Sequence, residues 1–358
     1  MEQYSEQFNK CGVLEEIVPR KIKEQKEISY YSDNLQYTKE TGNDIQGINN
    51  ALNDPIWNLL DRGGKRWRPT LCIMIAEAYG KKMEDVAEIA ALCEIVHNGT
   101  LMVDDLEDNS LVRRNQPCTH LLYGNDIAVN AGNFMYFVPF MRLLKSDKFT
   151  DKQKLQFSQI YAEEMTNLHL GQGWDICWHS PERSQGYVPT KDQYLQMTSH
   201  KTGVLARLSS RLVCTALDLD VESEQIISRF AERIGVAFQI QDDILNIDGE
   251  EYLATKGMMG EDIHEGKMSL MVIHSYNNGT KEDSARLLEI VKSKPEDIET
   301  IKEAIQLIKK TDSIKFSKQI AEELIQIAWN DGMEKVLPEG DAKIKLKLLA
   351  EYNIGRKI

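Results

Sequence analysis

The chain has 358 residues, of which 42% are hydrophobic and 28% are charged. This composition is that of an ordinary globular protein and excludes a disordered or fibrous chain. The net charge of −13 argues against binding to nucleic acids or to anionic membrane surfaces, which recruit proteins through basic patches. An anionic substrate must therefore meet a local concentration of lysine and arginine side chains.

The N-terminal residues MEQYSEQFNKCGVLEE have neither the apolar core of a signal peptide nor the Arg-rich, acid-poor composition of a transit peptide. No uninterrupted apolar run approaches the ~20 residues of a membrane span. The six cysteines are scattered without a CxxC pair, so we expect buried free thiols. These observations predict a cytoplasmic protein with no integral membrane segment.

Apolar residues recur at i, i+3, i+4 and i+7 along most of the chain, which predicts helices and almost no strands. Glycines and short loops separate these helices, and no long Pro/Ser linker divides the chain. We therefore expect an all-α fold with one helical domain over residues 46–358 and a peripheral polar segment, residues 1–45, before it. The expected helices cover residues 69–80, 85–103, 126–145, 151–170, 191–217, 222–247, 283–310 and 314–331.

Cationic residues gather next to loop glycines in the segment GGKRWRP and recur at a few later positions. Each of these residues alone is usually a surface residue. Together with the acidic motifs below, they predict charge-assisted hydrogen bonds to diphosphate groups, one group bound through metal and one held mainly by cations. The cationic positions are Lys65, Arg68, Arg113, Arg114, Lys201 with Thr202, Lys256 and Lys267.

The first acidic motif is LMVDDLEDNSLVRRNQP, in which Asp104 and Asp108 lie four residues apart and share one helical face. Two carboxylates aimed at one point repel each other unless a cation lies between them, and hard oxygen ligands suit Mg²⁺. His97 lies on the same face two turns earlier. Taken alone, an acidic cluster of this kind is more often a solvated helix surface.

The second acidic motif is RIGVAFQIQDDILNI, a helix with a polar stripe opposite an apolar one. By itself this stripe is explained equally well by a buried hydrogen-bond network. Two such helices predict that their carboxylates face each other across a helix bundle and bind a cluster of metal ions. The polar stripe consists of Gln239, Asp242, Asp243 and Asn246.

Several segments of the chain resemble, in order and spacing, the motifs of the trans-prenyl diphosphate synthases. They are GGKRWRP, ALCEIVHNGTLMVDDLEDNSLVRRNQPCTHLLYG, the Lys201–Thr202 step, FQIQDDILNI and GEDIHEGKMS, and they span roughly residues 55–275. VNAGNFMYF and EEMTNLHLGQGWDICWHS look most like the eukaryotic geranylgeranyl diphosphate synthases. The resemblance implies the all-α bundle of the isoprenoid synthase type with a central substrate cavity, and a homodimer.

The resemblance also implies an Mg²⁺-dependent prenyltransferase that condenses isopentenyl diphosphate with dimethylallyl, geranyl or farnesyl diphosphate. It implies three Mg²⁺ ions per active site, bound by Asp104, Asp108 and Asp242, and catalytic roles for Asp104, Asp105, Asp108, Lys201, Asp242 and Lys256. The allylic diphosphate is expected to contact Arg113, Lys201, Thr202, Gln239, Lys256 and Lys267. Isopentenyl diphosphate is expected to contact Lys65, Arg68, His97 and Arg114.

Product length is expected to depend on the room below the first acidic motif. Gly99 and Thr100 are small where short-chain synthases carry aromatic residues, which predicts a deeper pocket, although close helix packing explains small residues equally well. Tyr136, Phe137 and His169 match residues that line the pocket floor in the eukaryotic geranylgeranyl synthases. We therefore expect geranylgeranyl diphosphate, with twenty carbons, or longer polyprenyl diphosphates.

Two positions depart from the family pattern, and other functions remain as alternatives. Asn246 stands where many relatives have a third aspartate, and Asn115 replaces the glycine usual after the paired arginines.

A farnesyl diphosphate synthase is the first alternative. A terpene cyclase has no isopentenyl diphosphate to hold, so GGKRWRP and Arg114 argue against it. A head-to-head synthase needs different acidic motifs, and a non-catalytic partner subunit is expected to have lost metal ligands.

Overall fold

The computed structural model describes residues 1–31, 42–248 and 260–355. In these ranges all regular structure is helical except for one short hairpin, so the predicted all-α fold is confirmed. The chain divides into two compact units, Met1–Phe157 and Ser158–Ile358, which are described here one at a time.

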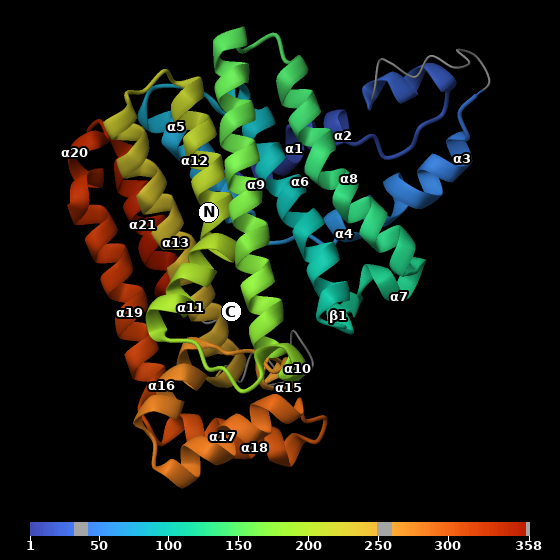
Figure 1. The fold of residues 1–358 in the computed structure, drawn as a ribbon. Helices are drawn as coiled ribbons and strands as arrows, with labels where there is room; N and C mark the ends of the chain where they lie inside the picture. The colour runs from blue at the N-terminus through green and yellow to red at the C-terminus, as the bar shows by residue number, and fades with distance from the viewer. Residues whose placement is uncertain (32–41, 249–259, 356–358) are drawn as a thin grey trace. The chain divides into compact units, whose positions relative to one another are not determined.

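Unit 1 runs from the N-terminus to the first turns of α9 (Figure 1). Its elements are α1 (Glu2–Lys10), α2 (Val13–Ile17), η1 (Gln25–Tyr30), α3 (Ile45–Ile48), η2 (Asn49–Asn53), α4 (Asp54–Leu60), α5 (Trp67–Ala78), α6 (Met83–Glu107), β1 (Val112–Arg113), β2 (Gln116–Pro117), α7 (Thr119–Tyr123), α8 (Asn125–Lys145) and the start of α9 (Asp151–His179).

Helix α6 is the centre of unit 1, because it packs against both α5 and α8 (Figure 1). At the crossing of α6 and α8 the two backbones approach closely at Gly99 and Gly132. A Cβ atom built on Gly99 would lie 2.8 Å from the carbonyl oxygen of Gly132 and 2.8 Å from the Cβ of Met135. Gly99 therefore serves the helix contact, which is the second of the two explanations that its small size allowed.

Among the described residues, α6 is also the one helix long and apolar enough to cross a membrane. Its most apolar window has a mean hydropathy of 1.3, and 78% of that window is buried, as in the core helix of a folded domain.

The segment before residue 45 contributes to the core of unit 1. Phe8 and Ile17 are buried, and α1 and α2 pack against α5 and α6 respectively. Arg20 donates two hydrogen bonds to the carboxylate of Asp61, at 2.9 and 3.0 Å, and its guanidinium lies 3.9 Å from the ring centre of Trp57. The domain boundary near residue 45 stays a prediction.

Unit 2 contains the rest of α9 and all later elements. These are α10 (Pro181–Ser184), α11 (Lys191–Thr198), η3 (Ser199–Gly203), α12 (Val204–Ala216), α13 (Val221–Asp248), α15 (Glu261–Glu265), α16 (Leu270–Asn278), α17 (Lys281–Ser293), α18 (Ile298–Lys309), α19 (Ser313–Ala328), η4 (Trp329–Met333), α20 (Glu334–Val336) and α21 (Asp341–Gly355).

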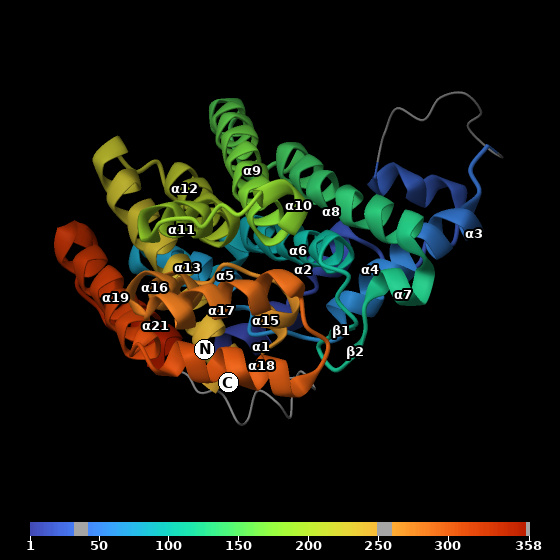
Figure 2. The same cartoon turned by 60° about the horizontal axis from the view of Figure 1, so that its bottom comes forward.

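Helix α13 is the core helix of unit 2 and packs against α12 and α19, while α17 and α18 lie side by side (Figures 1 and 2). The single helix expected over residues 283–310 is in fact this pair. Helix α17 ends because Lys294 is left-handed, with φ of 49°, and Pro295 follows. Helix α18 begins where the Asp297 side chain accepts a hydrogen bond from the Thr300 N–H at 2.8 Å.

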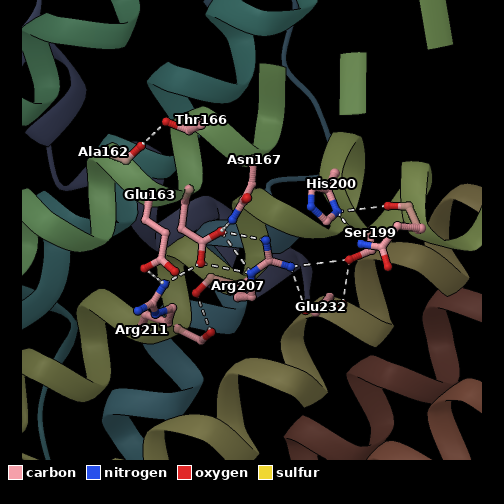
Figure 3. Close-up of polar contacts among 12 residues, drawn as sticks. Ala162, Glu163, Thr166, Asn167, Ser199, His200, Arg207, Arg211 and Glu232 are labelled. Atoms are coloured by element: carbon pink, nitrogen blue, oxygen red, sulfur yellow. Dashed lines mark hydrogen bonds and ion pairs between the residues drawn. The ribbon is translucent and has the colours of Figure 1, made fainter. Parts of the chain in front are cut away.

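A buried ion network joins α9, α12 and α13 (Figure 3). The side chain of Glu164 is only 1% exposed and accepts hydrogen bonds from Arg207, at 2.7 to 3.0 Å, and from Arg211, at 2.7 Å. Arg207 also donates to Glu232 at 2.7 Å. The network lines a cavity of about 480 Å³. Because carboxylates already pair with both guanidiniums, we assign this network to the packing of unit 2.

Candidate active site

The first acidic motif lies at the C-terminal end of α6. Asp104 belongs to the last turn, and Asp108, which caps the helix, keeps right-handed helical backbone angles of φ −87° and ψ −7°. The two residues therefore keep the i, i+4 relation that places both carboxylates on one side, as the sequence predicted. Both side chains are half-buried.

Asp105 points into unit 1 and is only 1% exposed. Its Oδ1 accepts hydrogen bonds from the Nε of Arg113, at 2.7 Å, and from Nη2 of the same side chain. Two hydrogen bonds to one ionised partner hold the guanidinium in a fixed orientation. The structure thus pairs Asp105 with Arg113, which the sequence analysis assigned separately.

Arg113 and Arg114 lie on the hairpin formed by β1 and β2, in which Arg113 pairs with Gln116. The two turn residues, Arg114 and Asn115, both have positive φ, 53° and 60°. Two left-handed residues in a two-residue turn are the pattern of a type I′ hairpin, and asparagine accepts this conformation better than other non-glycine residues. Asn115 therefore fits the place of the usual glycine.

Arg114 reaches back from the turn into unit 1. Its Nη1 donates to the Asn98 Oδ1 at 3.1 Å and to the Leu59 carbonyl oxygen at 3.3 Å. Burial, against the opposing charge of Glu94, lowers the pKa of Arg114 to about 10. Arg114 remains a cation at neutral pH, and its desolvation strengthens any hydrogen bond that it donates to an anion.

His97 lies on α6 two turns before Asp104 and shares its surroundings with a group of arginines. Burial lowers the pKa of His97 well below 6.5, and the positive charges of Arg68 and Arg114 lower it further. Arg68 is buried, and its guanidinium lies 4.6 Å from the ring centre of Trp67. Unit 1 thus brings together three of the four residues predicted to contact isopentenyl diphosphate, and the fourth, Lys65, is exposed on the preceding loop.

Sequence reasoning missed the ion pair beneath this cationic group. Arg66 is buried and donates through Nη1 to the buried carboxylate of Glu94, and its Nη2 donates to the Leu60 carbonyl oxygen at 3.0 Å. The same Glu94 oxygen accepts from the Asn98 Nδ2 at 2.7 Å. Glu94 and Asn98, one helical turn apart, carried the sequence signal: two polar residues inside an otherwise apolar helix.

In unit 2 the second acidic motif belongs to a chain of hydrogen bonds on α13. Gln239 Nε2 donates to the Asp243 Oδ1 at 2.8 Å, and the Tyr194 hydroxyl donates to the Asp243 Oδ2 at 2.7 Å. The hydroxyl of Thr202 donates to the Gln239 Oε1 at 3.1 Å. Asp243 is thereby held on both oxygens, and Asp242, next to it, is half-buried.

Lys201 and Thr202 lie on η3, a π-helical turn between α11 and α12. Such turns are frequent at functional sites, because the extra residue re-aims the side chains that the turn carries. Lys201 Nζ donates to the Asp175 Oδ2 at 2.6 Å. The charge of Lys201 lowers the pKa of Asp175 against the effect of burial, so this pair is ionised at neutral pH.

A small hollow of about 60 Å³ opens among these residues. Burial raises the pKa of Asp243 to about 6, and burial with the nearby charge of Asp243 raises that of Asp262. Sequence reasoning missed Asp175, Tyr194 and Asp262, although the last belongs to the segment GEDIHEGKMS. The hollow is lined by Asp175, Tyr194, Met197, Thr198, Lys201, Thr202, Gln239, Asp243, Asp262, Lys267, Met268 and Ser269.

Asn246, which replaces the third aspartate of the motif, is buried and accepts hydrogen bonds from two backbone N–H groups. Its side-chain oxygen accepts a hydrogen bond from the N–H of Asp262 at 3.2 Å, and its carbonyl oxygen accepts from the N–H of Gly260 at 2.9 Å. Asn246 therefore holds the N-terminal end of α15.

The remaining predicted residues lie in different surroundings. Tyr136 is buried on α8, Thr100 is half-buried on α6, and Lys267 contacts Glu265 at 2.5 Å. Phe137 is 65% exposed, and His169, whose Nδ1 lies 2.8 Å from the Met165 carbonyl oxygen, is also exposed. Lys256 lies outside the described residues.

In the described part of the chain, no three histidine, cysteine or acidic side chains converge on a preformed metal cage. The donors still fit Mg²⁺, since this ion keeps several waters and is usually bound through one or two carboxylates and substrate phosphates. Asp104 and Asp108 offer such a pair in unit 1, and Asp242 offers a carboxylate in unit 2.

The chain resembles known proteins over most of its length. Residues 49–308 match the family model described as Polyprenyl synthetase. The chain is 34% identical over 299 residues to the geranylgeranyl pyrophosphate synthase olcC of Penicillium canescens, covering 83% of this chain and 84% of that protein. It is also 34% identical over 262 residues to a short chain isoprenyl diphosphate synthase of Methanocaldococcus jannaschii, covering 73% and 76% of the two chains.

The fold is similar to the crystal structure of a geranylgeranyl pyrophosphate synthetase from Pyrococcus horikoshii. The TM-score is 0.80 at 26% sequence identity, and the alignment covers 99% of both chains.

Proposed function

Because the chain belongs to the polyprenyl synthetase family, we propose that it condenses isopentenyl diphosphate with an allylic diphosphate and releases geranylgeranyl diphosphate. The observation that carries this proposal is in unit 1. The helix that bears Asp104 and Asp108 also bears His97. Arg68 and Arg114 lie close enough to His97 for their charges to add to the effect of burial and lower its pKa. One helix thus joins a metal-type carboxylate pair to a group of cations suited to a diphosphate.

Isopentenyl diphosphate is proposed to bind to the cations of unit 1. Arg68 and Arg114 supply fixed guanidinium forks, and Lys65 supplies a mobile charge on the exposed loop. His97 is neutral at physiological pH because of its lowered pKa, so it offers one N–H donor and leaves the charge to the arginines. The partly buried setting makes each charge-assisted hydrogen bond stronger than in water.

From the family resemblance, the residues proposed to contact the allylic diphosphate are Arg113, Lys201, Thr202, Gln239 and Lys267. Asp105 orients Arg113, and Asp175 orients Lys201, so each cation is held by a buried carboxylate. Lys256, outside the described residues, is assigned to the same diphosphate by the family motif.

The carboxylates of Asp104, Asp108 and Asp242 are proposed to hold the Mg²⁺ ions that accompany the allylic diphosphate. Bound there, Mg²⁺ stabilises the negative charge that develops on the leaving diphosphate. The number of three ions is proposed from the family resemblance.

The condensation needs no side-chain nucleophile. The carbon–oxygen bond of the allylic diphosphate breaks, both electrons leave with the diphosphate, and an allylic cation remains. The double bond of isopentenyl diphosphate supplies the electron pair of the new carbon–carbon bond, and loss of a proton to the released diphosphate forms the new double bond. The protein aligns the two reactants, stabilises the leaving group and excludes water from the cation.

A product of twenty carbons is proposed because the similar proteins include geranylgeranyl pyrophosphate synthases. Thr100, one turn before Asp104, is the half-buried small residue at which the growing chain is proposed to pass α6. Gly99 is not offered for this role, since α8 occupies the space beside it.

A homodimer is proposed from the exposed apolar side chains of α7 and α8. Phe137 and Met141 lie four residues apart on one face of α8, and Leu121 and Leu122 lie on α7; all four are exposed. Large exposed apolar groups in one region mark interaction surfaces, and a second copy of the chain is the partner that the family resemblance suggests.

A product assay tests the proposed function. The purified chain is incubated with labelled isopentenyl diphosphate and with dimethylallyl, geranyl or farnesyl diphosphate, in Mg²⁺ or in EDTA, and the products are sized. We expect a twenty-carbon product in Mg²⁺ and none in EDTA. A product that stops at fifteen carbons would support a farnesyl diphosphate synthase instead, and no elongation with any primer would overturn the enzyme proposal.

Replacement of a single carboxylate tests the acidic motif. Asp104→Ala is expected to lower kcat by at least about 100-fold, as loss of an electrostatic catalytic group commonly does, with little change in thermal unfolding. Glu107→Ala, an exposed acid in the same helical turn, is the matched control and is expected to keep kcat within a few-fold of the unchanged chain. Equal activity of the two variants would show that the motif is misassigned.

A further inference from the structure

We propose that Arg62 is a positioning residue that clamps the β1–β2 hairpin and thereby holds Arg113 and Arg114 in place for their diphosphates. Arg62 belongs to none of the motifs that define the active site. This role rests on the proposed function, because it gives the hairpin arginines substrates to meet.

The side chain of Arg62 divides its hydrogen bonds between two parts of unit 1. Nη1 donates to the Arg113 carbonyl oxygen at 3.0 Å and, more weakly, to the Gln116 carbonyl oxygen at 3.5 Å. Nε donates to the Asn58 carbonyl oxygen at 3.2 Å, and Nη2 donates to the Asn58 Oδ1 at 2.5 Å. One planar guanidinium thus ties the end of α4 to both strands of the hairpin.

The hairpin needs such a clamp because little else in its own structure stabilises it. Each strand has only two residues, and an isolated two-stranded hairpin is marginal in water. Pro117 has no N–H to donate to the ladder. Arg114 occupies the left-handed region, where a residue other than glycine or asparagine costs about 1 kcal/mol or more.

The hydrogen bonds of Arg62 go to Asn58 and to the hairpin carbonyl oxygens, so we assign this residue to positioning the hairpin and not to binding a diphosphate. The atoms Nε, Nη1 and Nη2 all donate to Asn58 or to the hairpin. Burial is the main cause that lowers the pKa of Arg62, and Asp105 opposes that effect. The repulsion between the Arg62 and Arg113 guanidiniums is offset by Asp105, whose carboxylate accepts a hydrogen bond from Arg113.

The clamp fixes the positions of both hairpin arginines. From these positions the Arg113 side chain donates a hydrogen bond to Asp105, and the Arg114 side chain donates one to Asn98. Freeing the hairpin carbonyls lets the turn move relative to α6, and a displacement of about 1 Å of a substrate-positioning group can cost a factor of ~100 in rate. Because Arg114 is the proposed isopentenyl diphosphate contact, the largest change is expected in KM for that substrate.

The test compares Arg62→Met and Arg62→Lys with a matched control, Arg20→Met. Arg20 makes a bidentate pair with Asp61, the residue next to Arg62, and its Nε donates to Glu15 rather than to the hairpin. For each variant, thermal unfolding, kcat, and KM for isopentenyl diphosphate at saturating allylic diphosphate are measured. Amide hydrogen exchange of residues 112–117 is measured in the same variants.

We expect Arg62→Met to raise KM for isopentenyl diphosphate by roughly 10-fold or more and to speed exchange in residues 112–117 by a similar factor. Arg62→Lys can still donate to one carbonyl, so its KM and its exchange rate are expected to lie between those of Arg62→Met and of the unchanged chain. Arg20→Met, which removes a pair between solvent-exposed side chains, is expected to change thermal stability only slightly and to leave KM and hairpin exchange unchanged. Unchanged KM and exchange in folded Arg62→Met, or an equal KM rise in Arg20→Met, would overturn the clamp.

Hydrogen exchange separates this proposal from the proposed function. If the unchanged chain elongates no primer, the function fails, while faster hairpin exchange in Arg62→Met alone still supports the clamp. If the unchanged chain is active and exchange at the hairpin does not respond to Arg62→Met, only the clamp fails.

Discussion

Asn115 illustrates how backbone conformation decides which residues a site tolerates. The family pattern that the sequence resembles has glycine after the paired arginines, and Asn115 departs from it. The positive φ of Asn115 gives the physical reason for both residues, since asparagine is among the few side chains that enter the left-handed region at low cost. Arg114 takes the same conformation without that advantage, and its guanidinium is held by Asn98 and Leu59.

The pKa of His97 makes a prediction about stability and pH. In the folded chain this pKa lies well below 6.5, so as the pH falls below about 6.5 the unfolded chain takes up a proton first. The contribution of neutral His97 to stability is therefore complete above pH 6.5 and is lost as the pH falls. His97→Gln should reduce the loss of unfolding free energy between pH 7.5 and 5.5, measured by urea titration. An unchanged loss would show that His97 does not titrate in this way.

The structure predicts that a larger residue at Gly99 changes the stability of unit 1, whereas the sequence suggested a change in product length. A larger residue there was expected to shorten the product by blocking the pocket. Since even a Cβ atom would meet the Gly132 carbonyl oxygen, Gly99→Ala should destabilise unit 1 by about 1 to 3 kcal/mol, as overpacked core positions do. Denaturant unfolding measures this change. Thr100→Ala, at the half-buried neighbouring position, is the control, and an equal effect of the two would contradict the close contact.

At the scale of elements, the apolar periodicity predicted the existence of the long helices and most of their positions. It failed at residues 283–310, where two amphipathic helices follow each other with the same polarity pattern. The break at Lys294 and Pro295 was visible as a proline followed by a capping aspartate, Asp297. Periodicity alone could not find it, because both α17 and α18 keep an apolar face.

In the ion network of α9, α12 and α13, we expect replacement of a buried member to cost far more stability than replacement of an exposed one. Burial raises the pKa of Glu164, but hydrogen bonds and charge from Arg207 outweigh it, so Glu164 is ionised in the core. Arg207→Ala leaves that buried carboxylate short of a partner and should destabilise the fold by about 3 to 5 kcal/mol. Glu163→Gln, at a side chain that is 59% exposed, should cost less than about 1 kcal/mol.

Denaturant unfolding of both variants checks this asymmetry (Figure 3). The result that would contradict it is a small effect of Arg207→Ala, within about 1 kcal/mol. Arg211 would then be sufficient to hold Glu164 by itself.

For the whole molecule, the sequence predicted the family, and the comparisons confirm it. The motifs carried that information, because each is a local pattern of charge and glycine. What no local pattern contains is the pairing of residues far apart, such as Lys201 with Asp175 or Tyr194 with Asp243. These pairs depend on tertiary packing, so the sequence could name Lys201 but not Asp175, the carboxylate that holds it.

The proposed homodimer makes a prediction for the whole molecule. Phe137→Glu should convert the dimer to a monomer, because a charge replaces an apolar group that is 65% exposed on α8. Sedimentation velocity gives the mass. Val221→Glu, at an apolar residue that is 68% exposed in unit 2, is the control and should stay dimeric. A monomeric unchanged chain, or a dimeric Phe137→Glu, would contradict the proposed surface.

The π-helical turn at Ser199–Gly203 also constrains how this chain can vary in length. The turn contains one residue more than an α-helical turn, and each residue advances a helix by about 100°. Loss of one codon within α11 or α12 would therefore rotate Lys201 away from Asp175 or turn the apolar face of α12 outward, whereas loss of one residue from the turn itself would restore an α-helical turn. The turn is thus the place at which this part of the chain can lose one residue while α11 and α12 stay in register.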